Sequence, residues 1–233
     1  MPHAIVLRSI PIVRWILGTL VVLVVLGLPL LYYRHTYEHA RRLRVVADNN
    51  VALADGRTAH HVILRSGQLT ADGFRDAVRR YGIRTVVNLQ EEARDPLLPA
   101  SMFDKTRIRE SELLAELGVK YVPLDGGVLD HPDREPGSRP LVVDQFLAVI
   151  QNPENHPILF HCKAGLHRTG LMTAIYRMEY HHRSPAEVIE ELKANGFGTF
   201  AATDANLYLD RFIMQFRPST QKPVATPHEE AKP

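Results

Sequence analysis

The stretch PILFHCKAGLHRTG, residues 157–170, joins a hydrophobic run to a polar segment that contains two glycines. The run PILF predicts a short buried strand, and the residues from Arg168 onward predict the start of a helix. Cys162, the single cysteine of the chain, lies between them. A lone cysteine is more often a small buried residue than a nucleophile, so the residues around Cys162 must decide which it is.

Strand and helix patterns alternate along the chain on both sides of this stretch. Short runs rich in β-branched residues predict strands at 60–66, 84–90, 119–125 and 156–162. Apolar stripes with helical spacing predict helices at 70–82, 107–118, 140–152, 168–182, 184–196 and 204–216. This alternation predicts an α/β fold with a mainly parallel central sheet flanked by helices. In such sheets sites form at the carboxyl ends of strands, where Cys162 lies.

The first fifty residues differ from the rest in composition. From Trp15 to Tyr33 the chain carries no charge, with Arg14 before this run and Arg34 after it. As a helix the run would be about 28 Å long, close to the thickness of a bilayer core. A core helix would have a polar face, and a signal peptide would be followed by a small-residue cleavage site. We therefore expect a single-pass membrane anchor, and the flanking arginines leave its orientation open.

The remaining composition is that of one globular domain with appendages. Hydrophobic residues make up 45% of the 233 residues and charged residues 23%. The net charge of +2, without a basic block, gives no reason to expect nucleic acid as a partner. The expected organisation is an N-terminal tail at 1–14, the anchor at 15–33, a charged stalk compatible with a helix at 34–52, the domain at 53–216 and a disordered tail at 217–233.

The turn from the predicted strand into the following helix has the features of an anion site. After His161, a loop of about six residues turns backbone N–H groups inward, and the helix adds its own unpaired N–H groups and its dipole. Gly165 permits a turn that a Cβ would oppose, and Gly170 permits close packing of the helix start. The planar Arg168 fork suits two phosphate oxygens. At the base of this cradle the dipoles favour the thiolate form of Cys162.

The segment HCKAGLHRTG resembles the His-Cys-x5-Arg-Ser/Thr-Gly signature of cysteine-dependent protein tyrosine and dual-specificity phosphatases. It is most similar to the loops of dual-specificity enzymes. The preceding NPENHPILFHC, with RSGQL and YGIRTVVNL upstream, resembles atypical dual-specificity phosphatases of fungi, plants and bacteria, over about residues 60–215. The single tryptophan, Trp15, lies in the anchor, so the Trp-Pro-Asp loop of the larger tyrosine-specific enzymes is absent.

The resemblance implies a role for each residue of the loop. Cys162 would be the nucleophile that forms a cysteinyl-phosphate, and Arg168 would bind the phosphate and stabilise the charge of the transition state. Thr169 would donate a hydrogen bond to the sulfur, and His161 would orient the loop. The phosphate-binding segment would comprise Lys163, Ala164, Gly165, Leu166, His167 and Arg168. No metal or other cofactor is implied.

The resemblance also implies a general acid on the loop after the strand KYVPL. Asp125, Asp130 and Asp133 all lie there. Asp125 follows the strand directly, in a Pro-Leu-Asp-Gly-Gly pattern similar to some dual-specificity enzymes. Asp130 lies 32 residues before Cys162, nearer to the common family spacing than Asp125, which lies 37 before it. Turn formation is the alternative use of these aspartates. We expect Asp125 to be the acid, with Asp130 as the alternative.

These expectations describe a membrane-anchored cysteine phosphatase. The substrates expected first are phosphotyrosine proteins, with phosphoserine and phosphothreonine as additional targets. A phosphoinositide or inositol-phosphate phosphatase is the alternative, with which Lys163 and the anchor are compatible. A pseudophosphatase that only binds phosphoryl groups would lack the cysteine, arginine or acid. The twelve histidines have no carboxylate or cysteine at ligand spacing, so no metal site is expected.

Overall fold

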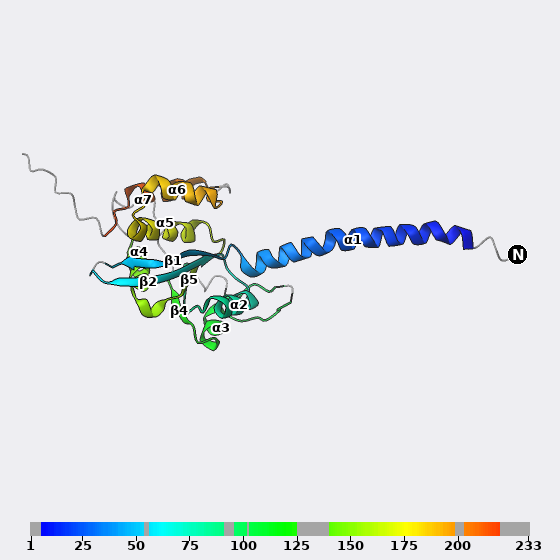
Figure 1. Cartoon of the computed structure of the whole chain (residues 1–233), viewed down its shortest axis with the longest axis horizontal. Helices are drawn as coiled ribbons and strands as arrows, with labels where there is room; N and C mark the ends of the chain where they lie inside the picture. The colour runs from blue at the N-terminus through cyan, green and yellow to red at the C-terminus, as the bar shows by residue number, and fades with distance from the viewer. Residues whose placement is uncertain are drawn as a thin grey trace, which may run out of the picture.

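A five-stranded sheet in the order β1-β2-β5-β3-β4 forms the centre of the domain in this computed structural model (Figure 1). The structure describes residues 6–53, 56–90, 96–101, 103–124, 140–198 and 203–219. The strands are β1 (Arg44–Ala52), β2 (Thr58–Ser66), β3 (Thr85–Asn88), β4 (Lys120–Pro123) and β5 (Ile158–His161). The helices are α1 (Val6–Ala40), α2 (Ala71–Tyr81), α3 (Glu110–Glu116), α4 (Leu141–Gln151), α5 (His167–His181), α6 (Pro185–Ala194) and α7 (Thr203–Gln215), with a short 3-10 turn, η2 (Pro153–Asn155).

The predicted α/β fold with a mainly parallel sheet is confirmed. Strands β2, β5, β3 and β4 pair in parallel, and among the described strands only the edge strand β1 runs antiparallel to its neighbour, β2. The central strand is β5, whose last residue, His161, is in register with Ser66 of β2 and Asn88 of β3. Three carboxyl ends therefore meet at one edge of the sheet, where Cys162 follows β5.

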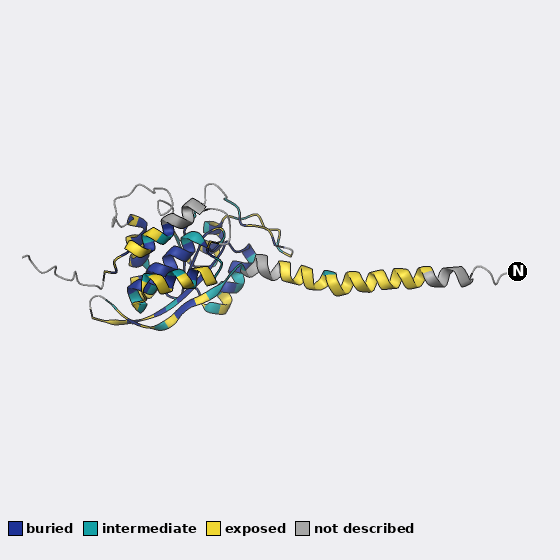
Figure 2. Ribbon diagram, turned by 90° about the horizontal axis from the view of Figure 1, so that it is seen from above, coloured by how far each residue is buried: buried dark blue, intermediate teal, exposed yellow. Residues whose placement is uncertain are grey.

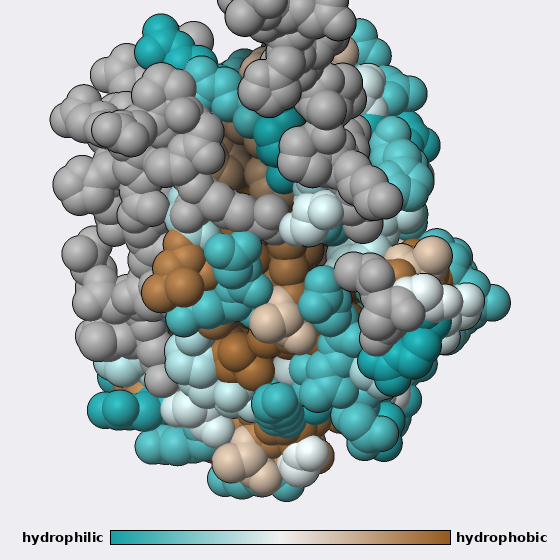
Figure 3. Space-filling view, turned by 90° about the vertical axis from the view of Figure 1, so that its left-hand side faces the viewer, coloured by the Kyte–Doolittle hydropathy of each residue, from teal (hydrophilic) through white to brown (hydrophobic). Residues whose placement is uncertain are grey.

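Helices cover both faces of the sheet. One hydrophobic cluster joins the sheet to α4, α5, α6 and α7, and a second joins it to α2 and α3, so the domain has three layers (Figure 1). Burial is concentrated in the sheet and α5, whereas α1 is exposed along its apolar length (Figure 2). On the face turned away from α1, apolar side chains lie in small patches among polar ones (Figure 3).

Local signals in the sequence account for several helix ends. The Thr70 hydroxyl accepts a hydrogen bond from the N–H of Gly73 at the start of α2, and Gly82 ends that helix in the left-handed conformation. At the start of α6, Ser184 and Glu187 form the reciprocal bonds of a capping box. The helices therefore begin and end close to the predicted positions.

The structure differs from the stalk predicted at 34–52. Helix α1 continues only to Ala40, and residues 44–52 form β1, which pairs with β2 along its whole length. The polar segment from Asp48 to Asn50 looked like a solvated stalk because an edge strand has one exposed side. Val46, Ala47 and Val51 are nevertheless buried against the domain. The sheet thus begins about nine residues earlier than the boundary at 53, and the other boundaries stay predictions.

Helix α1 contains a long apolar segment. Residues 12–34 are long and apolar enough to cross a membrane, and none of that window is buried against the rest of the chain. The segment includes the run predicted at 15–33. Length and composition are also compatible with a signal sequence, because a segment near the N-terminus passes the same criterion.

A cluster of aromatic rings packs between β2 and α5, beyond the amino end of β5. The ring of His61 stacks on that of His156 with centroids 4.6 Å apart, and its Nδ1 lies 3.3 Å from the Tyr176 hydroxyl. Burial, helped by the charges of His156 and other nearby histidines, lowers the pKa of His61 to about 4. The imidazole of His61 is therefore neutral near pH 7.

Candidate active site

The predicted strand, loop and helix around Cys162 are present. All four residues of β5 are fully buried, Cys162 follows with 6% of its surface exposed, and α5 begins at His167. We call residues 162–168 the phosphate loop. Its position at the carboxyl edge of the sheet follows from the central place of β5 in the strand order.

Each carbonyl oxygen from residue 163 to residue 166 of the phosphate loop accepts a hydrogen bond. The N–H of Gln68 donates to Lys163 at 3.1 Å, and that of Gly170 donates to Leu166 at 2.8 Å. The other two donors are arginine side chains. Nη1 of Arg42 donates to Ala164 at 3.0 Å, and Nη2 of Arg65 donates to Gly165 at 2.7 Å.

These bonds fix the direction of the loop's N–H groups. In a trans peptide the carbonyl and the next residue's N–H point in opposite directions. Four carbonyls held from outside therefore turn the N–H groups of residues 164–167 toward the interior of the loop. Helix α5 adds the N–H groups of its first turn, and its N-cap residue, Leu166, makes no side-chain cap. The arrangement suits a bound anion.

Gly165 is required by the path of the loop. Its φ is +69°, and a Cβ there would lie 2.5 Å from the nitrogen of Gly67 and 2.7 Å from the carbonyl of Ser66. Both contacts are with backbone atoms of the segment after β2, so they cannot be relieved by a side-chain rotation. The requirement predicted for Gly165 therefore has two independent physical causes, conformation and space.

Arg65 lies beneath the phosphate loop with only 2% of its surface exposed. Besides its bond to Gly165, it donates from Nη1 to the Thr173 hydroxyl at 2.9 Å, which connects the loop to α5. Burial, with the charge of Arg44, lowers the pKa of Arg65 to about 9, and the charge of Cys162 opposes this effect. Arg65 is therefore still cationic at neutral pH and interacts favourably with a Cys162 thiolate.

A family model described as "DSP-PTPase phosphatase fused to NAD+ Kinase" matches residues 42–207, which include every described strand from β1 to β5. The chain belongs to this DSP-PTPase family. It is therefore a cysteine-dependent phosphatase, and the resemblance found in HCKAGLHRTG is confirmed.

Two curated relatives are inositol diphosphatases of Arabidopsis thaliana. The chain is 33% identical to inositol diphosphatase DSP4 over 81 residues, which cover 35% of this chain and 38% of that protein. It is 32% identical to inositol diphosphatase DSP2 over 74 residues, 32% of this chain and 26% of the relative. The matches thus span well under half the length of either relative.

Two of the solved structures that resemble this chain come from a yeast and a bacterium. The core catalytic domain of the PP-IP phosphatase SIW14 from S. cerevisiae is 21% identical, with a TM-score of 0.48, covering 66% of this chain and 80% of that one. TpbA of P. aeruginosa is 23% identical, with a TM-score of 0.43, covering 65% of this chain and 85% of that one.

Within this DSP-PTPase loop, the predicted site residues lie together. Arg168 is half-buried and donates from Nη1 to the carbonyl of Leu89 after β3, at 3.1 Å, which uses one of its N–H groups. Thr169 is fully buried, and its hydroxyl has no partner among the described residues. The predicted bond from the Thr169 hydroxyl to the Cys162 sulfur is therefore not formed in this structure, and donation to the sulfur during the reaction stays a prediction. Lys163 is exposed, and the half-buried His167 packs its ring edge-on against Phe197.

His161 is held by a buried carboxylate that the sequence analysis did not find. Its Nε2 donates to Oε1 of Glu110 at 2.8 Å, and Nε2 of Gln68 donates to the other carboxylate oxygen, also at 2.8 Å. His161 is fully buried and Glu110 is 2% exposed. The pair fixes the imidazole directly before Cys162. In the sequence, Glu110 looked like an ordinary acidic residue in the first turn of a helix.

Arg65 and Arg42 were also missed as site residues. A signal for Arg65 was available, because an arginine that directly follows the apolar run VIL near the end of a strand must find buried partners. Arg42 gave no such signal, since it lies in a run of exposed-looking basic residues 122 positions from Ala164.

The expected general acids Asp125, Asp130 and Asp133 lie outside the described residues. The last described residue before them is Leu124, whose N–H donates to the carbonyl of Asn88 at 2.8 Å. Asn88 is in register with His161. The chain therefore leaves β4 beside the carboxyl ends of β3 and β5, and the choice among the three aspartates stays open.

Proposed function

We propose that this DSP-PTPase hydrolyses phosphate groups of inositol phosphates, with diphosphate groups as the first candidates, through a cysteinyl-phosphate on Cys162. The observation that carries this proposal is the 33% identity to an inositol diphosphatase over 81 residues. This identity favours the inositol-phosphate alternative over phosphotyrosine proteins, which the sequence alone made the first expectation.

The charges around the phosphate loop support a substrate with several phosphates. Arg168 and Lys163 belong to the loop, and Arg42 donates to it from the segment before β1. Inositol phosphates carry several anionic groups close together, so a basic rim would attract them more strongly than a peptide with one phosphate. Arg168 would contact the reacting phosphate, and Lys163 a neighbouring one.

The proposed reaction has two steps. The Cys162 thiolate attacks phosphorus, the bond to the leaving oxygen breaks, and the phosphoryl group becomes attached to sulfur. Arg168 and the loop N–H groups stabilise the charge on the transferring oxygens, and Thr169 donates to the sulfur. An aspartate, for which Asp125 is the first candidate, protonates the leaving oxygen. The same carboxylate then takes a proton from water, which attacks phosphorus, releases inorganic phosphate and restores the thiolate.

A substrate panel with the full chain in detergent tests this proposal. Phosphate release is measured from an inositol pyrophosphate, inositol hexakisphosphate, phosphoinositide vesicles, a phosphotyrosine peptide and a phosphoserine peptide. We expect the highest kcat/KM for the inositol pyrophosphate and loss of all turnover in Cys162→Ser. A higher kcat/KM for the phosphotyrosine peptide would restore the phosphoprotein interpretation. Turnover that survives in Cys162→Ser would exclude the cysteinyl mechanism, and phosphate binding without turnover in the wild type would indicate a pseudophosphatase.

We also propose that residues 12–34 hold the enzyme in a membrane as a single-pass anchor. The proposal is supported by the length and composition of this segment and by its exposure in α1. Cell fractionation with alkaline carbonate washing tests it. The full chain should remain in the membrane pellet at its full mass. Release into the soluble fraction as a chain shortened at its N-terminus would identify the segment as a signal sequence instead.

A further inference from the structure

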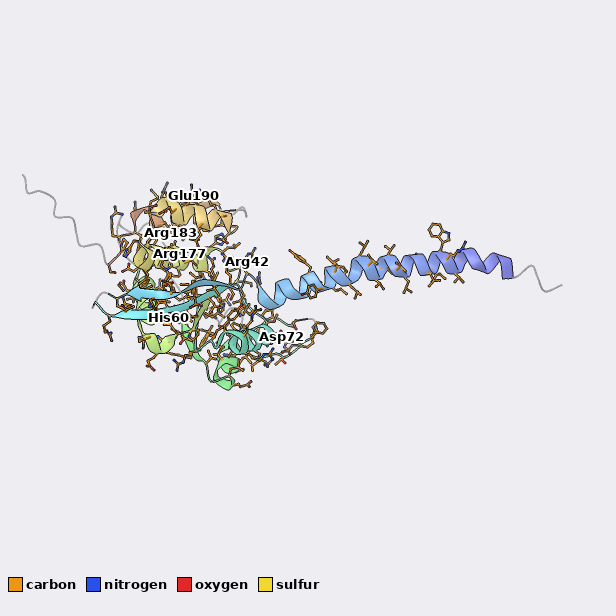
Figure 4. The ribbon with its side chains drawn as sticks, in the orientation of Figure 1. Arg42, His60, Asp72, Arg177, Arg183 and Glu190 are labelled. Atoms are coloured by element: carbon orange, nitrogen blue, oxygen red, sulfur yellow. The ribbon has the colours of Figure 1, made fainter. Side chains whose placement is uncertain are left out.

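The segment between α1 and β1 packs directly against the phosphate loop. We call this segment, residues 41–43, the joint. The N–H of Gly67 donates to the carbonyl of Arg41 at 2.8 Å, and Nη1 of Arg42 donates to Ala164. A Cβ on Gly67 would lie 2.9 Å from Cδ of Arg41 and 3.1 Å from the carbonyl carbon of Ala164. Gly67 is thus enclosed between the joint and the loop, and Arg42 lies where α1 meets the domain (Figure 4).

The backbone of the joint is held in an unusual conformation. Arg42 has a φ of +59°, which non-glycine residues rarely adopt because the Cβ approaches the following carbonyl oxygen. This conformation ends α1 and turns the chain sharply into β1. It also brings the Arg42 side chain to Ala164, so the strained turn and the bond to the loop occur in the same residue.

We propose that Arg42 is a positioning residue of the phosphatase reaction. By holding the Ala164 carbonyl outside the loop, it turns the N–H of Gly165, which belongs to the same peptide, toward the substrate phosphate. Gln68 and Gly170 hold the neighbouring carbonyls by backbone N–H groups, and Arg65 does so from the sheet. Among these four donors, Arg42 belongs to the joint, which lies outside the parallel strands and the helices that connect them. The proposal rests on residues 162–168 being the phosphate site.

The test uses the full chain in detergent and inorganic phosphate as the probe. Arg42→Met keeps the apolar stem and removes the donor, and the matched control is Arg57→Ala at the opposite end of the β1–β2 hairpin. The Kd of inorganic phosphate is measured by calorimetry and the kcat/KM with p-nitrophenyl phosphate. Arg42→Met should raise the Kd and lower the kcat/KM by about tenfold each, as expected for a lost charged donor. Arg57→Ala should change neither, and Arg42→Lys should recover part of the loss.

Ionic strength separates this role from a general charge effect. If Arg42 only contributed positive potential, the ratio of wild-type to Arg42→Met affinity would fall toward one at high salt. Positioning through a direct bond predicts a ratio that persists. A purely structural role would lower the thermal unfolding midpoint and leave the phosphate affinity of the folded protein unchanged.

The proposal fails if Arg42→Met binds phosphate within about twofold of the wild type, since a lost charged donor should cost more. It also fails if the difference disappears at high salt. If Arg42→Met does not fold, Arg42→Gln is used instead, because the glutamine side chain is too short to reach the Ala164 carbonyl. Neither probe contains inositol, so a failure of the proposed substrate leaves this test intact.

Discussion

Substitution of Gly165 by alanine should disable the phosphate loop by displacing it, in addition to the loss of stability that alanine causes at any left-handed position. The new Cβ would lie 2.5 Å from the Gly67 nitrogen, whereas ordinary contact begins at 3.4 Å, so the two segments must separate by about 0.9 Å. A misplacement of about 1 Å near reacting groups can cost about 100-fold in rate. The left-handed φ of +69° adds a cost of about 1 kcal/mol for any residue with a Cβ.

Gly82→Ala and Gly118→Ala provide matched controls for this experiment. Both glycines have a positive φ, +62° and +67°, and an added Cβ would meet nothing within 4 Å. Each control should lose about 1 kcal/mol of unfolding free energy and keep its activity. The assay is kcat/KM with p-nitrophenyl phosphate, alongside thermal unfolding of the same samples.

The expected result is a fall in kcat/KM of about 100-fold in Gly165→Ala alone. If Gly165→Ala kept its kcat/KM within about threefold of the wild type, the loop would tolerate the displacement, and the link between loop position and rate would be refuted. Equal losses in the two controls would show that general destabilisation is responsible.

Three further predictions concern the acid, the histidine partner and the buried ring cluster. Asp125→Asn should slow the hydrolysis of alkyl phosphate esters more than that of p-nitrophenyl phosphate. The reason is that nitrophenolate is a weaker base than an alkoxide and depends less on a proton when it leaves. Inositol diphosphates should behave like p-nitrophenyl phosphate, because their leaving group, a phosphate, is also a weaker base than an alkoxide. An unchanged rate with an alkyl ester would move the assignment to Asp130. Glu110→Gln should lower kcat/KM by about tenfold, since His161 would lose a charged partner, and unchanged kinetics would show that the pair is not needed. Because the pKa of His61 is lowered to about 4, the unfolded chain binds a proton at higher pH than the folded one. The contribution of neutral His61 to the free energy of unfolding should therefore be fully present above about pH 6.5 and should fall as the pH drops toward about 4. Thermal unfolding as a function of pH measures this, and a curve for His61→Phe with the same slope would contradict the assignment to His61.

The sequence predicts those parts of the fold that depend on local patterns. The run ILFH before Cys162 is uniformly apolar except at its end, as a central parallel strand must be, and β2 and β3 contain the shorter apolar runs VIL and VV. Edge strand β1 was missed because only its inner side is buried, so its polar residues resembled a linker. A strand with one exposed face would normally show strict alternation, but the burial of β1 does not alternate strictly, because its register shifts between Val45 and Ala47.

The sequence predicts the site residues that are close together in the chain, but not the contacts between residues that are far apart in it. Cys162, Arg168 and Gly165 belong to one signature, so a short window contains them all. The bonds of His161 to Glu110 and of Ala164 to Arg42 join residues 51 and 122 positions apart. No local pattern encodes such pairs, because they depend on the strand order and on the path of the chain between elements.

The contact between the joint and the phosphate loop has a geometric consequence if α1 spans a bilayer. The apolar window ends at Arg34 and the joint begins at Arg41, so six helical residues, 35–40, separate them, a rise of about 10 Å from Arg34 to Arg41. A headgroup layer is about 5–7 Å thick on each side of the hydrocarbon. The phosphate loop would then stand at a fixed height just above the lipid headgroups. Substrates that diffuse in the plane of the bilayer would approach it differently from those that must enter the gap between domain and lipid. Inserting or removing turns of α1 after Arg34 would change that height and leave the chemistry of Cys162 untouched.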